Sequence, residues 1–373
     1  MEWNPTTVAR KNLGRFVSLP QDFISKVPAA GPNLDRQFKL VDKPALMFRE
    51  STAELIHLID KEGSKDACST AFVVDGARGS GKTASLLLTA SHFRSKGWVV
   101  IAAPRVSQWF SGIEPYEPSA DGSKYYQPDL ARKLLESIVA WNPSALEKLP
   151  SLGSSGQTVA NVAASGIAGA VPAHDAFEDV VKSILAAKDR PPVLIALDQF
   201  NALFRKTEYC NAKSQPIMSN EFAVAMVFHN ILAELGQPKT AILGAVDKTE
   251  SLVNSYYLQN LLQKLPAVNK TAGKALDQPA VVDLASRDEF EVILPPSINP
   301  VHNDAFAEQF KQTPKHISRV HIPEYSHSEV GQVLHFYSQN NVLYKEVSDR
   351  LVAKWWMISQ GNPLDVFKSC ISL

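Results

Sequence analysis

A short apolar run that breaks into glycines is the feature that most constrains how this chain can fold. Residues 71–75 read AFVVD, and residues 76–83 read GARGSGKT. The second segment matches the phosphate-binding pattern G-x-x-x-x-G-K-[ST] at every specified position. Glycines leave backbone N–H groups open to close approach by a polyphosphate, which larger side chains would obstruct. The sequence therefore predicts a site for a nucleoside triphosphate or diphosphate.

The residues of this segment have separate predicted roles. Lys82 would contact the β- and γ-phosphates, and the Thr83 hydroxyl would ligate Mg²⁺. A helix that begins near Gly81 would add the positive end of its dipole. The residues expected around the phosphates are Gly76, Ala77, Arg78, Gly79, Ser80, Gly81, Lys82 and Thr83.

The flanking sequence supports this prediction. Residues 84–90 (ASLLLTA) continue as an apolar, helix-forming stretch, and residues 98–103 (WVVIAA) read as a second buried strand. Strand, glycine loop, helix and strand in this order form a βαβ unit. A surface turn rich in glycine and serine is the alternative interpretation, and it would not require this context.

A second apolar run ends in a carboxylate. Residues 193–197 read VLIAL and are followed by Asp198. Such a run predicts a buried parallel strand that delivers its aspartate to the carboxyl edge of the sheet, where ligands of open α/β folds bind. We expect Asp198 to join the Mg²⁺ shell through a water molecule. A helix cap or a loop aspartate is the alternative.

The next residue, Gln199, is the candidate catalytic position. Many ATPases that remodel proteins have a glutamate there, which polarises the attacking water. Glutamine can orient a water but is a poor proton acceptor. We therefore expect slow hydrolysis or none, with the nucleotide acting mainly as a bound structural element. Some GTPases position water with a glutamine, so Gln199 remains compatible with turnover.

A further core strand is predicted at residues 241–246 (AILGAV), before Asp247 and Thr249. These two residues stand where a sensor of the γ-phosphate would lie. Strand termination and helix capping explain them equally well.

Composition limits the class of protein. The chain has 373 residues, of which 45% are hydrophobic and 20% charged, which suits a large α/β protein with a sizeable core. Its formal net charge is zero, unlike that of a protein that coats nucleic acid with a basic face. Affinity for RNA would have to come from local patches. Because no run of eighteen apolar residues occurs, we expect no membrane span. No metal beyond Mg²⁺ is predicted.

Three regions are predicted along the chain. Residues 1–45 contain several prolines and no sustained periodicity, which indicates an extended arm. Residues 46–324 would form the nucleotide-binding core, an α/β fold with a mostly parallel sheet flanked by helices. Residues 325–373 would form a small helical lid, which a capping box at Ser326 opens.

Two segments of the core have further predicted roles. Residues 44–61 read as the segment and helix that precede the first strand, a usual place for the nucleotide base to rest. Residues 159–171 (VANVAASGIAGAV) are small and glycine-rich, and they read as a flexible connector.

The order of these features resembles that of AAA+-related nucleotide switches, P-loop proteins whose lid often carries a glycine–proline motif near the base. More narrowly, the chain from about residue 45 onward resembles the mitochondrial small-subunit ribosomal protein family of death-associated protein 3. The segments that carry this resemblance are GARGSGKTASLLL, YYQPDLA, LIALDQFNALF, IPEYSHSEVGQVLHFYSQNNVL and SQGNPLDVF.

That resemblance implies a location and a ligand. The family sits in the head of the small subunit of the mitochondrial ribosome, in the matrix, near the face that meets the large subunit. Its implied partners are small-subunit proteins and rRNA, together with large-subunit proteins through an inter-subunit bridge. Its members are similar to GTP-binding P-loop proteins, so GTP or GDP with Mg²⁺ is the implied ligand. Gly76 to Thr83 would hold the phosphates, Asp198 the metal shell, and Pro363 would lie near the base.

The base itself is not specified by the residues. A guanine-reading [NT]-K-x-D element does not occur in the chain, so ATP remains an alternative ligand. Two hypotheses follow. The chain is either a structural ribosomal subunit stabilised by a bound guanine nucleotide, or an active AAA+-like ATPase or GTPase switch that is not stably bound to the ribosome.

Overall fold

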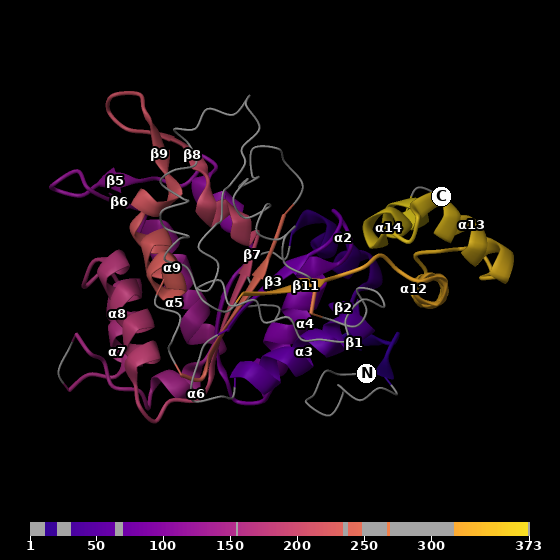
Figure 1. Ribbon diagram of the computed structural model, residues 1–373, viewed down its shortest axis with the longest axis horizontal. Coiled ribbons are helices and arrows are strands. Elements are labelled where there is room, and N and C mark those ends of the chain that lie inside the picture. Colours follow the sequence, from indigo (N-terminus) through magenta and orange to yellow (C-terminus); the bar gives the residue numbers. More distant parts are fainter. Residues whose placement is uncertain are drawn as a thin grey trace, which may run out of the picture.

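Five strands form a parallel sheet at the centre of the computed structural model (Figure 1). The structure describes residues 12–20, 31–63, 70–153, 156–233, 238–247, 267–268 and 317–371. The strands lie side by side in the order β11-β3-β10-β7-β4, and every neighbouring pair is parallel. Their bounds are β3 (Thr70–Asp75), β4 (Val99–Ala103), β7 (Val193–Asp198), β10 (Thr240–Ala245) and β11 (Ile317–His321). The predicted α/β class with a parallel sheet is confirmed, and β11 lies at one edge of the sheet.

The sheet is buried on both faces because its strands are apolar at successive positions. In β3, Ala71 and Val73 join one hydrophobic cluster, while Phe72 and Val74 join another on the opposite face. This alternation follows the two-residue period of a strand. Apolar side chains therefore point into two separate cores.

Helices cover both faces and give three layers (Figure 1). One face packs against α3 (Glu50–Gly63) and α4 (Lys82–Ser95). The other packs against a larger helical layer. That layer contains α5 (Pro128–Trp141), α7 (Val159–Ile167), α8 (Ala173–Ala186) and α9 (Ala223–Ala233).

Smaller elements connect these layers. They are α6 (Pro143–Leu146), three short helical turns (Val106–Phe110, Phe200–Phe204, Ser219–Glu221), and the hairpins β5 (Glu117–Pro118) with β6 (Tyr125–Tyr126) and β8 (Lys206–Cys210) with β9 (Pro216–Met218). Among the helices that the structure describes, none is long and apolar enough to cross a membrane.

The flexible connector predicted at residues 159–171 is wrong, because its first nine residues form α7. Thr158 caps this helix by accepting a hydrogen bond from the Asn161 N–H. A methyl group on Gly166 would lie only 2.4 Å from Cβ of Ala176 and 2.9 Å from Cδ1 of Leu135. The small residues therefore serve close helix packing rather than flexibility.

The described part of the predicted N-terminal arm contains regular structure. Strand β1 (Phe16–Ser18) pairs antiparallel with β2 (Ala45–Met47), and α2 (Pro32–Val41) lies between them in the chain. Pro32 occupies the first turn of α2, where its fixed φ suits a helix and its missing N–H costs nothing. A proline that suggested an irregular arm in the sequence thus begins a helix.

Three C-terminal helices occupy the region predicted to be a lid, and they share a core of their own. They are α12 (His327–Gln339), α13 (Asp349–Ser359) and α14 (Pro363–Ile371), drawn in yellow in Figure 1. The capping box is confirmed, since Ser326 Oγ accepts from the Glu329 N–H at 3.2 Å and Glu329 Oε2 accepts from the Ser326 N–H at 2.8 Å. Val41 and Met47 from the N-terminal region complete this lid core.

Candidate functional site

The glycine-rich loop joins the carboxyl end of β3 to the first turn of α4. Gly79 and Gly81 have φ angles of 82° and 100°, a region that side chains disfavour. A methyl group on Gly79 would lie 2.6 Å from Asn362 Oδ1 and 2.7 Å from Leu364 Cβ. Gly79 therefore allows both the turn of the loop and the close approach of the lid.

Lys82 begins α4 and folds over this loop. Its Nζ donates hydrogen bonds to the carbonyls of Gly76 at 3.0 Å and Ala77 at 2.7 Å. The side chain is buried, so its charge lies inside the loop rather than in bulk water. A cation held at the start of a helix makes this corner electropositive.

The two residues predicted for the metal shell are in direct contact. Thr83 Oγ1 donates to Asp198 Oδ2 at 2.9 Å, which brings the first turn of α4 to the end of β7. The Gln199 N–H donates to the other carboxylate oxygen at 3.0 Å. Burial raises the pKa of Asp198 to about 6, while these two hydrogen bonds oppose the shift and the nearby Asp247 carboxylate adds to it.

Gln199 and Asp247 belong to one polar network beside Asp198. Gln199 Nε2 donates to Asp247 Oδ2 at 2.9 Å, and its Oε1 accepts from the Ser107 hydroxyl. Asn201 holds the backbone of Asp247 by a reciprocal pair of 2.9 Å hydrogen bonds. The structure thus brings the sensor candidate Asp247 into the site, whereas Thr249 lies outside the described residues.

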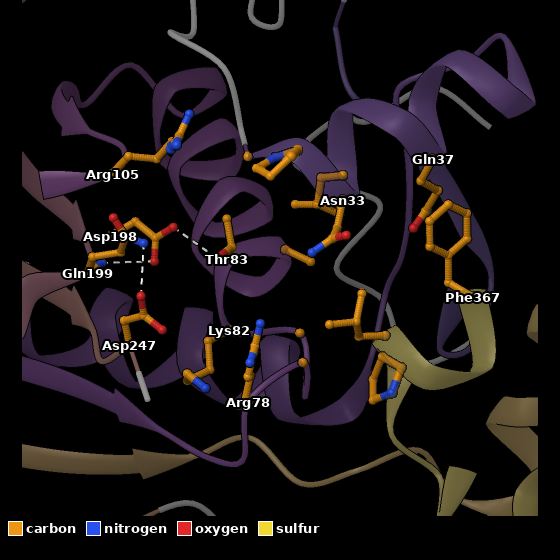
Figure 2. A pocket seen from close by; sticks show the side chains of 18 of the residues that line it. Asn33, Gln37, Arg78, Lys82, Thr83, Arg105, Asp198, Gln199, Asp247 and Phe367 are labelled. Atoms are coloured by element: carbon orange, nitrogen blue, oxygen red, sulfur yellow. Dashed lines mark hydrogen bonds between the residues drawn. The ribbon is translucent and has the colours of Figure 1, made fainter. Parts of the chain in front are cut away.

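Lys82, Thr83, Asp198, Gln199 and Asp247 face a cavity of about 500 Å³ (Figure 2). Its lining comprises Gly31, Pro32, Asn33, Leu34, Gln37, Arg78, Gly79, Gly81, Lys82, Thr83, Ala84, Arg105, Ser107, Asp198, Gln199, Val246, Asp247, Pro363, Leu364 and Phe367. Figure 2 shows Asp198, Gln199 and Asp247 on one side and Gln37 and Phe367 on the other, with the loop between them. The volume lies within the range of small-molecule and cofactor sites.

The lid reaches the loop through the residues around Pro363. Asn362 Nδ2 donates to the Arg78 carbonyl at 2.7 Å, and the Leu364 N–H donates to the Gly79 carbonyl at 3.2 Å. Pro363 lines the cavity, as the prediction of a place near the base requires.

Sequence reasoning missed three groups in this region. Arg105 lines the cavity with a left-handed backbone (φ 58°, ψ 50°), and its place just after β4 was an available signal. Asn33 and Gln37 of α2 carried no such signal. Residues 44–61, which we predicted as a resting place for the base, are not among the described residues that line this cavity, whereas five residues between 31 and 37 are.

Arg49 connects the loop to the lid. Its guanidinium donates to the carbonyls of Ser80 at 3.1 Å and Pro323 at 2.8 Å. It also donates to Glu329 Oε1 at 2.8 Å and lies 4.8 Å from the centroid of the Tyr325 ring. Only 6% of Arg49 is exposed, so it is a buried fork that ties three separate segments together.

The donor set suits a hard cation and a polyphosphate. Carboxylate and hydroxyl oxygens of Asp198, Asp247 and Thr83 are the ligand types that Mg²⁺ prefers. Arg78, Lys82 and Arg105 supply three basic side chains to the same cavity. Among the described residues, no group of three or more His, Cys, Asp or Glu side chains could hold a metal by itself. The arrangement therefore fits a cation shared with an anionic ligand.

Comparison with known proteins identifies similar chains. The family model described as mitochondrial ribosomal death-associated protein 3 matches residues 46–369. The chain is 22% identical to small ribosomal subunit protein mS29 of Neurospora crassa, over 96% of this chain and 74% of that protein. It is 23% identical to mS29 of Schizosaccharomyces pombe, over 97% of this chain and 72% of that protein. It is also 23% identical to mS29 of Bos taurus, over 71% of this chain and 70% of that protein.

Solved structures give a weaker likeness. Two structures of the Aeropyrum pernix ORC2 protein, one with ADPNP and ADP and one with ADP, cover 87% of this chain and 67% of theirs at 13% identity. Their TM-scores are 0.33 and 0.37, too low to say anything further about this chain.

Proposed function

The chain belongs to the family of mitochondrial ribosomal death-associated protein 3, and on this premise we propose that it holds a guanine nucleotide with Mg²⁺ as a structural element of the ribosome. Its relatives in two fungi and in cattle are small ribosomal subunit proteins. The chain is accordingly a component of the small subunit of the mitochondrial ribosome, and it is located there.

The contact between Thr83 and Asp198 carries the nucleotide part of the proposal. Asp198 is only 7% exposed, and its hydrogen-bond donors, a hydroxyl and a backbone N–H, are neutral. A buried carboxylate in such surroundings is costly unless a cation compensates for it. Mg²⁺ would supply that charge, and the Thr83 hydroxyl stands beside it as a second oxygen ligand.

The glycine-rich loop would hold the phosphates. Gly76, Gly79 and Gly81 have positive φ angles, which other residues disfavour, and such a turn would leave backbone N–H groups available to an anion. Lys82 would exchange the carbonyls of Gly76 and Ala77 for phosphate oxygens. Arg78 and Arg105 add positive charge around the same space. These residues would bind and orient the nucleotide without taking part in a reaction.

The state of Gln199 supports slow hydrolysis or none. Both ends of its amide are engaged, by Asp247 and by the Ser107 hydroxyl. A glutamine that orients an attacking water must offer its amide to that water. Gln199 would have to break these bonds first, so a retained nucleotide fits the site better than rapid turnover does.

The preference for guanine and the position within the subunit are inferred from the family. Guanine rather than adenine is inferred from the resemblance of the chain to GTP-binding members. A position in the head of the subunit, contacts with rRNA, and an inter-subunit bridge to large-subunit proteins are inferred in the same way.

Binding to the isolated chain tests the nucleotide site. Titration calorimetry with GDP and Mg²⁺ would compare the wild type with Lys82→Ala, and with Lys96→Ala as a control. Lys96 is a partly exposed lysine just after the same helix, paired with Asp60 and away from the cavity. We expect binding to be lost in the Lys82 variant and retained in the control. Equal binding by all three chains would overturn the assignment of the loop.

A further inference from the structure

Two amide side chains lie at the end of the cavity that faces away from Asp198. Asn33 and Gln37 both line the cavity and come from α2. They are four residues apart, so they project from the same face of the helix, one turn after the other. Figure 2 shows them on the opposite side of the cavity from Asp198 and Gln199. A polar face of α2 therefore lines this end of the site.

Three apolar side chains line the same cavity as the two amides. Leu34 comes from α2, while Leu364 and Phe367 come from the first turns of α14. Phe367 is only 3% exposed and belongs to the core of the lid. A cavity lined by apolar side chains and a few polar groups suits a flat heterocycle, because its faces are apolar and its edge makes hydrogen bonds.

The order of groups along the cavity places the base at this end. The metal-type oxygens of Thr83 and Asp198 mark one end, and the glycine-rich loop lies in the middle. A nucleotide whose terminal phosphates lie at the metal end must direct its base toward α2 and α14. The two carboxylates of the described lining, Asp198 and Asp247, are both at the metal end. Among the described lining residues from α2 and α14, Asn33 and Gln37 are the ones whose side chains can hydrogen-bond to a base.

We propose that Gln37 and Asn33 select the base by hydrogen bonding to the Watson–Crick edge of guanine. This inference rests on the nucleotide site proposed above. Gln37 Nε2 donates to the Ala45 carbonyl at 3.4 Å, which leaves Oε1 as the acceptor of this amide. Guanine presents two adjacent donors, its N1–H and its 2-amino group. Adenine presents a lone pair at N1, which Oε1 would repel. Asn33, one turn earlier at the rim, can donate to the guanine O6.

The specificity of the isolated full-length chain tests this assignment. Dissociation constants would be measured in Mg²⁺ for GDP, for ADP, and for IDP, which lacks the 2-amino group. The wild type is expected to bind GDP roughly 5- to 10-fold more tightly than IDP, because IDP loses one of the two hydrogen bonds that Oε1 would accept and keeps the one from N1–H. It is expected to prefer GDP over ADP as well.

Two variants change the acceptor in opposite directions. Gln37→Leu removes it, and the preference for GDP over IDP should then fall to about one. Gln37→Glu replaces it with a charged acceptor, and the preference for GDP over ADP should rise roughly 10-fold. A residue with only a structural role would not produce this gain. Lys39→Ala, on an exposed part of α2 that does not line the cavity, is the matched control.

The outcomes separate this inference from the proposed function. If the Gln37 variants leave both preferences unchanged while Lys82→Ala still abolishes binding, the nucleotide site stands and the role of α2 in reading the base is wrong. If the wild type binds none of the three nucleotides, both are wrong.

Discussion

Replacing Asp198 with asparagine should stabilise the ligand-free chain at neutral pH. Burial raises the pKa of this carboxyl from 3.8 to about 6, so the folded state pays for its ionisation at pH 7. A shift of roughly two units corresponds to about 3 kcal/mol. Asparagine avoids this cost and can still accept from the Gln199 N–H, while its amide donates to the Thr83 hydroxyl. We therefore expect Asp198→Asn to raise the free energy of unfolding by about 2 to 3 kcal/mol at pH 7.

The raised pKa of Asp198 also determines how the stability of the wild type changes with pH. Because the folded pKa of Asp198 is raised, the folded wild type binds more protons than the unfolded chain between pH 3.8 and about 6. The contribution of Asp198 to the free energy of unfolding of the wild type therefore rises as the pH falls through that window. The advantage of the variant should shrink to a few tenths of a kcal/mol by about pH 4.

Urea unfolding measures both effects, with and without Mg²⁺ and GDP. A ligand at 100 times its dissociation constant should add about 2.7 kcal/mol to the wild type. It should add little to Asp198→Asn, since the metal ligand is gone. Asp189→Asn, at an exposed carboxylate, is the control. A variant that is less stable than the wild type at pH 7, or a gap that does not change with pH, would refute the burial argument. Undiminished stabilisation by Mg²⁺ and GDP would remove Asp198 from the metal shell.

Two further predictions concern the contact between loop and lid. Arg49→Lys keeps the charge but cannot reach Ser80 and Glu329 together, so the free energy of unfolding should fall by about 2 kcal/mol in urea titrations. Unchanged stability would show that the guanidinium fork is dispensable. Gly79→Ala places a methyl group 2.6 Å from Asn362 Oδ1 at a φ of 82°, so thermal unfolding should occur several degrees lower and GDP should bind more weakly. Wild-type values for this variant would mean that the lid does not need its close approach to the loop.

The local parts of the site were predictable from the sequence. The glycine-rich loop and the Ser326 capping box depend on spacings of a few residues, and both are found where their patterns place them. Thr83 and Asp198 lie 115 residues apart, yet their contact was foreseeable because carboxyl ends of parallel strands share one edge of the sheet.

The rest depended on contacts that no short pattern encodes. Arg49 meets partners 31 and 280 residues away, so nothing in its own neighbourhood indicated a buried fork. Helix α2 reaches the cavity because β1 pairs with β2 and because Val41 packs into the lid core. In α7, small residues looked like a linker because the helices they pack against, α5 and α8, are apparent only in the folded chain.

The most direct test of the account is the nucleotide content of the assembled subunit. Mitochondria expressing tagged wild-type chain or Lys82→Ala would be lysed gently and sedimented through a magnesium-containing sucrose gradient, with the small-subunit RNA followed in the same fractions. Nucleotide extracted from those fractions would be identified by chromatography. We predict that the wild type travels with the RNA through a moderate salt wash and carries a guanine nucleotide, which the Lys82 variant lacks. A chain that stays at the top of the gradient, or subunits with the same nucleotide content in both cases, would contradict the account.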